Sequence, residues 1–425
     1  MVILASSWTP GASGTGLNEY PLDVIRYTLT IEPDIDKGFI DGTLIINFHV
    51  DPKAKSIVLD AGNLNVHEVT GNNVTAFSKN QNKLHIELSG RTQKENEIII
   101  KYDGNPQNGL QFHSETGEAY TVYFTSQWMV SHDSFHDRAS LHLNILVPKG
   151  KKCIASGELI GTGKRGDKTL FQWRQTYETP SYTYGFALGD FNEASDQVGN
   201  IKLNYYSSRL SGEVLKKVFV ETGNILQFFE QKSGVSYIQN SYSQILIGRH
   251  YQEMSGLSVL HASYASSVLK DSSEIHLASH ELAHQWWGNM ITCKNLDHFW
   301  LNEAFAVYMA SAFNEHKFGV EKYNSDIALY KSIYDGLVER NKDKPLVFTG
   351  WEASRDNRHV VYYKGAYVLH LLRQELGDAA FWAGIKSYSQ EYFGKSVETI
   401  GFQQAMEKST GRDLGDFFRK WVYEK

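Results

Sequence analysis

The sequence predicts an α+β protein of two domains, with antiparallel β structure in the first and mostly α-helix in the second. Apolar residues alternate with polar ones from about Tyr20 to Phe191, and they recur at helical spacing after about Asn200. A chain of 425 residues with 41% hydrophobic residues can also bury two cores. We therefore expect a flexible leader over residues 1–19, a β domain over 20–195 and a helical domain over 196–425.

The strands of the first half are predicted by period-two runs of apolar residues that turn residues separate. Turns are indicated at Asp41-Gly42, Gly71-Asn72-Asn73 and Asp103-Gly104-Asn105. Three of the alternating runs are Leu44/Ile46/Phe48/Val50, Leu84/Ile86/Leu88 and Leu141/Leu143/Ile145. Repeated strands with such breaks are typical of antiparallel sheets.

The helices of the second half are predicted by apolar residues at spacings of three and four, with glycines as stops. One short strand, Ser243 to Ile247, interrupts them. The expected helical regions run from Val214 to a stop at Gly234, from Asp271 to Gly288, from Asn295 to Phe318, from Val361 to Leu376 and from Leu414 to Glu424. Asp271 with Glu274 resembles a capping box at the start of the second region.

Composition excludes several classes of function. The net charge is −6 and no basic stripe is present, which argues against nucleic acid as a partner. No apolar run reaches the ~20 residues of a membrane span. Cys153 and Cys293 are too few and too far apart for a disulfide framework or a metal knuckle. We expect a soluble monomer, either cytoplasmic or exported after removal of the leader.

His280-Glu281-Leu282-Ala283-His284 carries the strongest chemical pattern in the chain. Histidines four residues apart on a helix point the same way and can coordinate one metal ion, and the glutamate then lies beside a water molecule bound to that metal. A catalytic zinc needs a third protein ligand and one vacant position. Glu303 lies nineteen residues after His284 among apolar neighbours, where a second helix can pack back on the first. Without that partner, the two histidines could be unrelated.

His280 to Asn289, followed by Trp300-Leu301-Asn302-Glu303, closely resembles the zinc site of the aminopeptidase N and leukotriene hydrolase family of gluzincins. The resemblance implies a saddle-like β domain and a thermolysin-like catalytic domain. It implies Zn2+ on His280, His284 and Glu303, and Glu281 as the general base toward the metal-activated water. It covers most of the chain, up to about Tyr423, without the C-terminal domains of many relatives.

Tyr362-Tyr363-Lys364-Gly365 resembles the family's Tyr-x-Lys-Gly segment. The family tyrosine donates a hydrogen bond to the tetrahedral oxyanion, and by position that residue is Tyr362 rather than Tyr363. A tyrosine that only packs in the core is the alternative. Oxyanion donors typically lower the activation barrier by about 3–4 kcal/mol.

Two further segments resemble the family's contacts to the substrate amine, each with departures. The stretch from His250 to Leu257 keeps the glutamate of Gly-x-Met-Glu-Asn as Glu253 but has lost the glycine and the asparagine. Thr125-Ser126-Gln127-Trp128-Met129 resembles a β-domain loop of the family, with Gln127 at the first polar position and Met129 at the second. Methionine cannot bind an amine, so recognition of the amine is left to Glu253 alone or to a further residue that the sequence does not identify. Gln127 stays a candidate contact to the substrate.

These residues predict a zinc aminopeptidase that acts on peptides with a free N-terminus. A thermolysin-like endopeptidase, an epoxide hydrolase side activity and an inactive binding module of the same fold are the alternatives. Glu253, Tyr362 and the β half argue against the endopeptidase, and the complete set of ligands and base argues against the inactive module. The sequence leaves the side-chain preference of the enzyme open.

Overall fold

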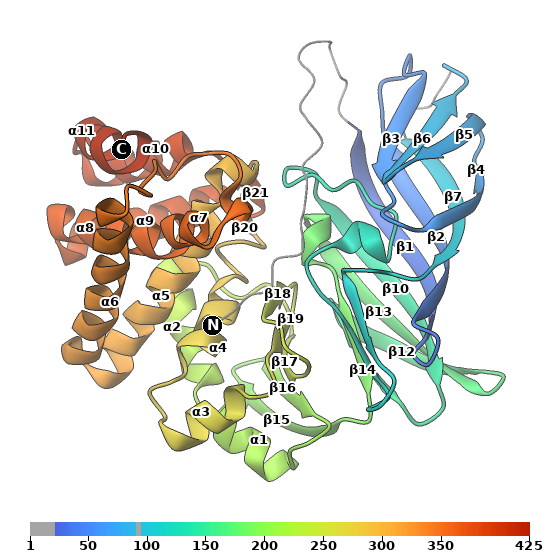
Figure 1. Ribbon diagram of the computed structural model, residues 1–425, viewed down its shortest axis with the longest axis horizontal. Coiled ribbons are helices and arrows are strands. Elements are labelled where there is room, and N and C mark those ends of the chain that lie inside the picture. The colour runs from blue at the N-terminus through green and yellow to red at the C-terminus, as the bar shows by residue number, and fades with distance from the viewer. Residues whose placement is uncertain (1–21, 91–94) are drawn as a thin grey trace.

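The computed structural model describes residues 22–90 and 95–425 in two parts that lie side by side, one of strands and one mainly of helices (Figure 1). The leader expected over residues 1–19 lies outside the described residues. None of the helices in the described part of the chain has the length and apolar character that a membrane crossing needs.

The N-terminal part consists of three sheets. A seven-stranded sheet has the order β12-β13-β10-β1-β2-β7-β4, a four-stranded sheet β11-β14-β9-β8 and a three-stranded sheet β3-β6-β5. Two short 3-10 helices, η1 (Thr125–Gln127) and η2 (Ser181–Thr183), lie between strands. The strands are β1 (Asp23–Asp34), β2 (Phe39–His49), β3 (Ser56–Asp60), β4 (Asn65–Thr70), β5 (Val74–Asn80), β6 (Lys83–Leu88), β7 (Glu95–Gly104), β8 (Leu110–His113), β9 (Glu118–Thr121), β10 (Ala139–Pro148), β11 (Lys152–Ala155), β12 (Glu158–Arg165), β13 (Lys168–Thr179) and β14 (Phe186–Gly189).

The apolar residues of the alternating runs form the core of this part, as predicted. The inward residues Leu44, Ile86 and Leu143 are fully buried. The pairing is antiparallel except between β1 and β10, which run parallel with Arg26 opposite Ser140. Parallel neighbours need a long crossover, and here the crossover is the chain between Asp34 and Ala139.

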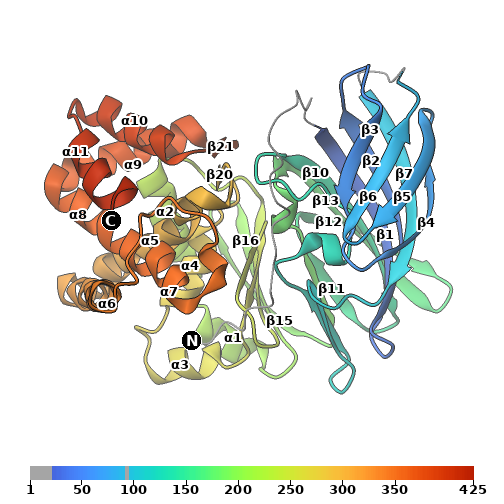
Figure 2. The same ribbon diagram turned by 45° about the horizontal axis from the view of Figure 1, so that its top comes forward.

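A five-stranded sheet lies between the β domain and the helices in both views (Figures 1 and 2). Its order is β15-β16-β17-β19-β18, from β15 (Asn192–Val198), β16 (Ile201–Ser207), β17 (Ser241–Leu246), β18 (Gln252–Met254) and β19 (Leu257–Leu260). Ile245 and Val259 join the core of the β domain, whereas Leu246 and Leu260 join the helical core. Only β17 was predicted from the sequence. The strands β18 and β19 were missed because they are buried on both faces and lose period two.

The helical part surrounds one large core and contains a second, small sheet of β20 (Ile291–Cys293) and β21 (Lys395–Val397). The α-helices are α1 (Gly212–Val218), α2 (Thr222–Ser233), α3 (Tyr264–Lys270), α4 (His276–Ala283), α5 (Trp300–Phe318), α6 (Val320–Glu339), α7 (Arg355–His359), α8 (Gly365–Leu376), α9 (Asp378–Tyr392), α10 (Thr399–Thr410) and α11 (Gly415–Phe418). Shorter turns are the 3-10 helices η3 (Leu296–His298) and η4 (Trp351–Ala353) and the π-helices η5 (Val360–Lys364) and η6 (Arg419–Tyr423).

Several predicted boundaries need correction. The helix expected from Asp271 to Gly288 is α4, of only eight residues, because the Asp271 carboxylate closes a turn onto Ser273 instead of starting the helix. The helix expected from Val214 to Gly234 is divided into α1 and α2. The expected domain boundary at residues 195 and 196 falls inside β15, which pairs with β16, so we propose to move it to the start of β15.

Candidate active site

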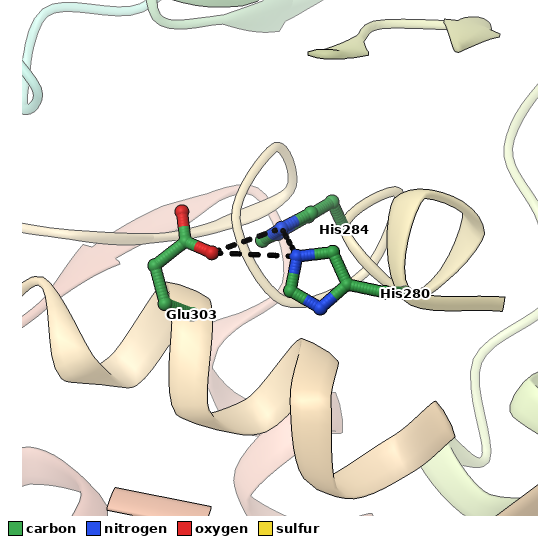
Figure 3. Close-up of side chains that lie close together, drawn as sticks. All are labelled: His280, His284 and Glu303. Carbon is green, nitrogen blue, oxygen red and sulfur yellow. Dashed lines mark hydrogen bonds and ion pairs between the residues drawn. The ribbon is translucent and has the colours of Figure 1, made fainter. Parts of the chain in front are cut away.

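Three predicted metal ligands lie together where α4 packs against α5 (Figure 3). His280 lies in the last turn of α4, His284 caps its C-terminal end and Glu303 lies in the first turn of α5. The Nε2 atoms of the two histidines are 3.1 Å apart. Oε2 of Glu303 lies 3.4 Å from Nε2 of His280 and 3.5 Å from Nε2 of His284. All three side chains are buried.

This cluster fits a zinc ion. Ligand atoms about 2.0–2.1 Å from a tetrahedral metal are themselves roughly 3.3 Å apart, close to the separations observed here. Oε2 of Glu303 is buried and faces the two imidazoles, at 3.4 and 3.5 Å and without a hydrogen bond within the described residues, a setting that a bound cation would stabilise. Two imidazoles and one carboxylate are also the donor set of a catalytic zinc site.

The loop after α4 fixes the orientation of His284. Its Nδ1 lies 2.9 Å from the carbonyl oxygen of Trp287, so Nδ1–H donates there and Nε2 faces the cluster. Gly288 passes close to the same ring. A Cβ on Gly288 would lie 2.8 Å from Nδ1, and its φ of +141° also disfavours a side chain.

The cluster carries separated charges. Burial alone would raise the pKa of Glu303, but the imidazoles of His284 and His280 hold it at about 2. Burial disfavours protonation of His284, yet the Glu303 carboxylate raises that pKa to about 10. These opposite shifts of the two pKa values favour a charged pair of Glu303 and His284, so a metal that binds here competes with a proton on His284.

Glu281 lies beside the cluster and lines the same cleft. Its side chain is buried, and its Oε2 makes no hydrogen bond to any described residue. Burial raises its pKa well above the ordinary value, and the nearby carboxylates of Glu253 and Glu303 raise it further. A raised pKa and a free oxygen are the properties that a general base requires.

Tyr362 lies beside His280 in the same cleft. Its ring stacks on the imidazole with centroids 6.2 Å apart and planes 13° apart. Burial, with Glu303 and Glu253 nearby, raises the pKa of Tyr362 well above its ordinary value, so the phenol keeps its proton and can donate it in a hydrogen bond. Tyr362 lies on the π-helix η5, a form that occurs often at functional sites.

Glu253 reaches the cleft from β18, the edge strand of the five-stranded sheet. Its carboxylate accepts a hydrogen bond of 3.2 Å from Nε2 of Gln252 and is otherwise directed to the cleft. Burial raises its pKa, an effect that His284 opposes. Asn289 donates to the backbone carbonyl of Glu253, which ties this strand to the loop after α4.

Gln127, the second predicted amine contact, is not brought to the cleft. It ends η1 and its side chain packs against Gly62 and Gly109 of the β domain. Met129 is fully buried in the β-domain core, so it does not replace a polar group of the site. A match in sequence does not determine which side chains of a 3-10 turn face the cleft.

Tyr123 and its neighbours line the cleft instead of Gln127. Tyr123 has a φ of +56°, which is uncommon for a bulky residue. The strained backbone is held by two bonds to the second domain, from Tyr123 N to Oε1 of Gln252 at 2.8 Å and from its hydroxyl to the carbonyl oxygen of Tyr251 at 2.9 Å. No motif in the sequence indicates this conformation.

Sequence reasoning also missed two β-domain residues that hold the loop after His284. Tyr182 donates to the carbonyl oxygen of Gly288 at 2.8 Å. The buried guanidinium of Arg138 donates to the carbonyl oxygen of Asn289 at 3.0 Å and to Oγ1 of Thr292 at 2.9 Å. Such contacts between distant parts of a chain have no local pattern in a single sequence.

Comparison with known proteins agrees with this geometry. The peptidase M1 N-terminal domain matches residues 24–183 and the peptidase family M1 domain matches residues 219–421. Probable aminopeptidase 1 of Sulfurisphaera tokodaii is 24% identical over 373 residues, which are 84% of this chain and 46% of that protein. The chain thus spans about half the length of this relative.

Two solved structures have the same fold. The M1 zinc metallopeptidase of Deinococcus radiodurans aligns with a TM-score of 0.81 at 23% identity, and the alignment covers 95% of this chain and 94% of the metallopeptidase chain. Yeast LTA4 hydrolase aligns with a TM-score of 0.80 at 19% identity and covers 95% of this chain and 68% of its own. With both domain models matched in order and the His280–Glu303 cluster at their centre, this chain is a member of peptidase family M1.

Proposed function

We propose that this protein is a zinc-dependent aminopeptidase that hydrolyses the N-terminal peptide bond of peptides. The observation that carries the proposal is the position of Glu253, whose carboxylate lines the same cleft as Glu281 and the His280–Glu303 cluster. A carboxylate beside the reacting centre binds the α-amino group of a substrate and leaves room for only one residue before the scissile bond. The name of the Sulfurisphaera tokodaii relative supports the same activity.

His280, His284 and Glu303 hold the zinc ion in this proposal. When bound, zinc lowers the pKa of a coordinated water to about 7 and polarises the scissile carbonyl. The hydrogen bond from His284 to Trp287 keeps the imidazole in the tautomer that a ligand needs. The buried setting strengthens each of these interactions, because few water dipoles screen them.

The remaining steps belong to the side chains of the cleft. Glu281 takes a proton from the attacking water and transfers it to the leaving amine. The hydroxyl of Tyr362 donates a hydrogen bond to the oxygen that gains negative charge in the transition state. Glu253 holds the substrate ammonium, so that the first peptide bond, and no other, lies between Glu281 and Tyr362.

The test compares leucine p-nitroanilide with its N-acetylated form. We expect turnover of the free amine and loss of at least ~10²-fold in kcat/KM on acetylation, because the acetylated nitrogen is neutral and cannot pair with Glu253. Equal turnover of both would exclude an aminopeptidase and favour an endopeptidase. Metal analysis should find one zinc per chain, and clearly less than one under non-chelating conditions would favour an inactive binding module.

Glu253→Gln sharpens this test. The variant keeps the size of the side chain but loses its charge, so we expect a higher KM for the free amine and little change for the acetylated compound. Glu158→Gln is a matched control, because Glu158 is a carboxylate at the start of β12 that binds Asn240 away from the cleft. If Glu158→Gln also lost the preference for the free amine over the acetylated compound, the effect of Glu253→Gln would reflect general destabilisation and not amine binding.

A further inference from the structure

Arg358 is the one lysine or arginine among the described residues that line the cleft. The other charged lining residues, apart from the histidines, are the carboxylates Asp133, Glu253, Glu281, Glu303 and Glu352. An anionic group of a substrate is repelled by most of this cleft. Apart from the proposed zinc ion, Arg358 is therefore the cationic side chain in the described lining that attracts it.

The guanidinium of Arg358 is fixed but mostly unpaired. Its Nη1 donates a hydrogen bond of 3.0 Å to the backbone carbonyl of Glu352, which uses one of five N–H groups. No carboxylate of the described residues forms an ion pair with it, whereas Arg340 nearby pairs with Asp356 at 3.1 Å. A half-buried guanidinium with free, coplanar donors is suited to bidentate binding of a carboxylate.

The helical geometry places Arg358 at a defined step from the reacting centre. Helix α7 continues directly into η5, so Arg358 and Tyr362 are four residues apart along one continuous helical segment, roughly 6 Å along its axis, and both line the cleft. Tyr362 stacks on His280 and marks the position of the scissile carbonyl. Each further residue of an extended peptide adds about 3.3–3.6 Å. A carboxylate one or two residues beyond the scissile bond thus comes within reach of Arg358.

Resting on the proposed aminopeptidase function, we propose that Arg358 binds the C-terminal carboxylate of short substrates, so that the preferred substrates are di- and tripeptides. Glu253 then binds the ammonium group at one end of such a peptide and Arg358 binds the carboxylate at the other. This pair of opposite charges selects a zwitterion of limited length. Longer peptides lose the contact with Arg358, because their carboxylate lies beyond it.

The test uses Leu-Gly-Gly and its C-terminal amide, which differ in the charge that Arg358 would bind. We expect the wild-type enzyme to prefer the free acid, mainly through KM. In Arg358→Gln the ratio of kcat/KM for acid over amide should fall ~10- to 100-fold, the usual effect of losing hydrogen bonds to a charged group. The ratio cancels any loss common to both peptides. Arg358→Lys should lie between the two, because it keeps the charge without the bidentate geometry.

Arg355→Gln is the matched control. Arg355 lies on the same short helix, is exposed and bonds to His359, and it does not line the cleft. The Arg355→Gln variant removes the same charge as Arg358→Gln and should keep the wild-type ratio of kcat/KM for acid over amide. A peptide series from two to six residues should show the preference for the acid disappearing beyond three. Dissociation constants of the acid and the amide, measured with Glu281→Gln, give the same comparison without turnover.

The outcomes separate this inference from the proposed function. If neither peptide nor leucine p-nitroanilide is hydrolysed by the zinc-loaded wild type, the aminopeptidase proposal fails. If both peptides are hydrolysed with equal kcat/KM, the aminopeptidase stands and the role of Arg358 is overturned. The role of Arg358 is also overturned if Arg358→Gln leaves the acid-over-amide ratio unchanged. The same holds if Arg355→Gln lowers that ratio as much as Arg358→Gln does.

Discussion

The hydroxyl of Tyr182 donates a hydrogen bond of 2.8 Å to the carbonyl oxygen of Gly288. The same hydroxyl accepts a bond of 3.2 Å from Nδ2 of Asn302, the residue before Glu303. One phenol of the β domain thus contacts both the loop that orients His284 and the helix that carries the third ligand. The first domain therefore helps to set the separation of the proposed zinc ligands.

Tyr182→Phe should weaken zinc binding without unfolding the protein. Loss of the hydroxyl frees the loop and α5 to move relative to each other, and changes around metal ligands typically cost ~10- to 100-fold in affinity. We expect the lower end of this range, because Tyr182 contacts no ligand directly. Competition with a chelator at fixed pH measures the effect.

Tyr184→Phe is the control for this prediction. Tyr184 is also a buried tyrosine of the β domain, but its hydroxyl donates to the carbonyl oxygens of Ala139 and Thr179 within that domain. It should lower the free energy of unfolding and leave zinc affinity as it was. Equal zinc affinity of Tyr182→Phe and the wild type would show that the domain contact does not position the ligands.

The acid limb of the pH profile should report the carboxylates around Glu281. The base must be ionised, so kcat/KM falls as the pH falls through its pKa. Burial and Glu253 raise that pKa, and removal of the charge in Glu253→Gln should therefore move the acid limb to lower pH. A profile of kcat/KM against pH with leucine p-nitroanilide tests this. A limb that stays in place, or moves to higher pH, would contradict the coupling of the two carboxylates.

Tyr362→Phe should lower kcat by ~10²- to 10³-fold, as loss of an oxyanion donor does, and leave the zinc content at one per chain. Tyr363→Phe is the comparison, because its ring packs against Tyr330 with centroids 5.6 Å apart rather than on His280. We expect a small effect there. A larger loss of kcat in Tyr363→Phe than in Tyr362→Phe would reverse the assignment.

The sequence predicted those parts of the site that depend on local spacing. His280 and His284 are one turn apart on any helix, and Glu303 needed only a second helix to pack on the first. It failed where geometry depends on distant contacts. Gln127 matched a motif but faces Gly62 and Gly109, and Tyr182 meets Gly288 across 106 positions of sequence.

The fold shows the same division. Period-two runs such as Leu44 to Phe48 predicted the β domain, because one face of each strand is buried and the other less so. In the five-stranded sheet, β18 and β19 were missed because strands that are buried on both faces lose that alternation. The start of α4 was misplaced because Asp271 can cap a helix or close a turn with equal ease, and packing decides between them.

Gly365→Ala should disturb the contact that brings Tyr362 to the proposed zinc ligands. A Cβ on Gly365 would lie 2.5 Å from Cβ of Ala304, the neighbour of Glu303, so α8 and α5 would have to separate. Overpacking of this kind costs about 1–3 kcal/mol, which outweighs the gain of up to about 1 kcal/mol in helix propensity. We expect a lower free energy of unfolding in urea and a lower kcat, because Tyr362 precedes Gly365 by less than one turn.

Gly223→Ala is the matched control, because its added Cβ would meet Cβ of Val198 at an ordinary 3.5 Å and should leave stability unchanged or slightly higher. The exchange Gly365→Ala with Ala304→Gly returns the lost space to the same contact. If close packing is what positions Tyr362, the double variant regains most of the kcat that Gly365→Ala loses. If stability returns while kcat does not, the glycine serves the backbone of η5 rather than the distance between the helices. That result would place the control of Tyr362 in the π-helix itself.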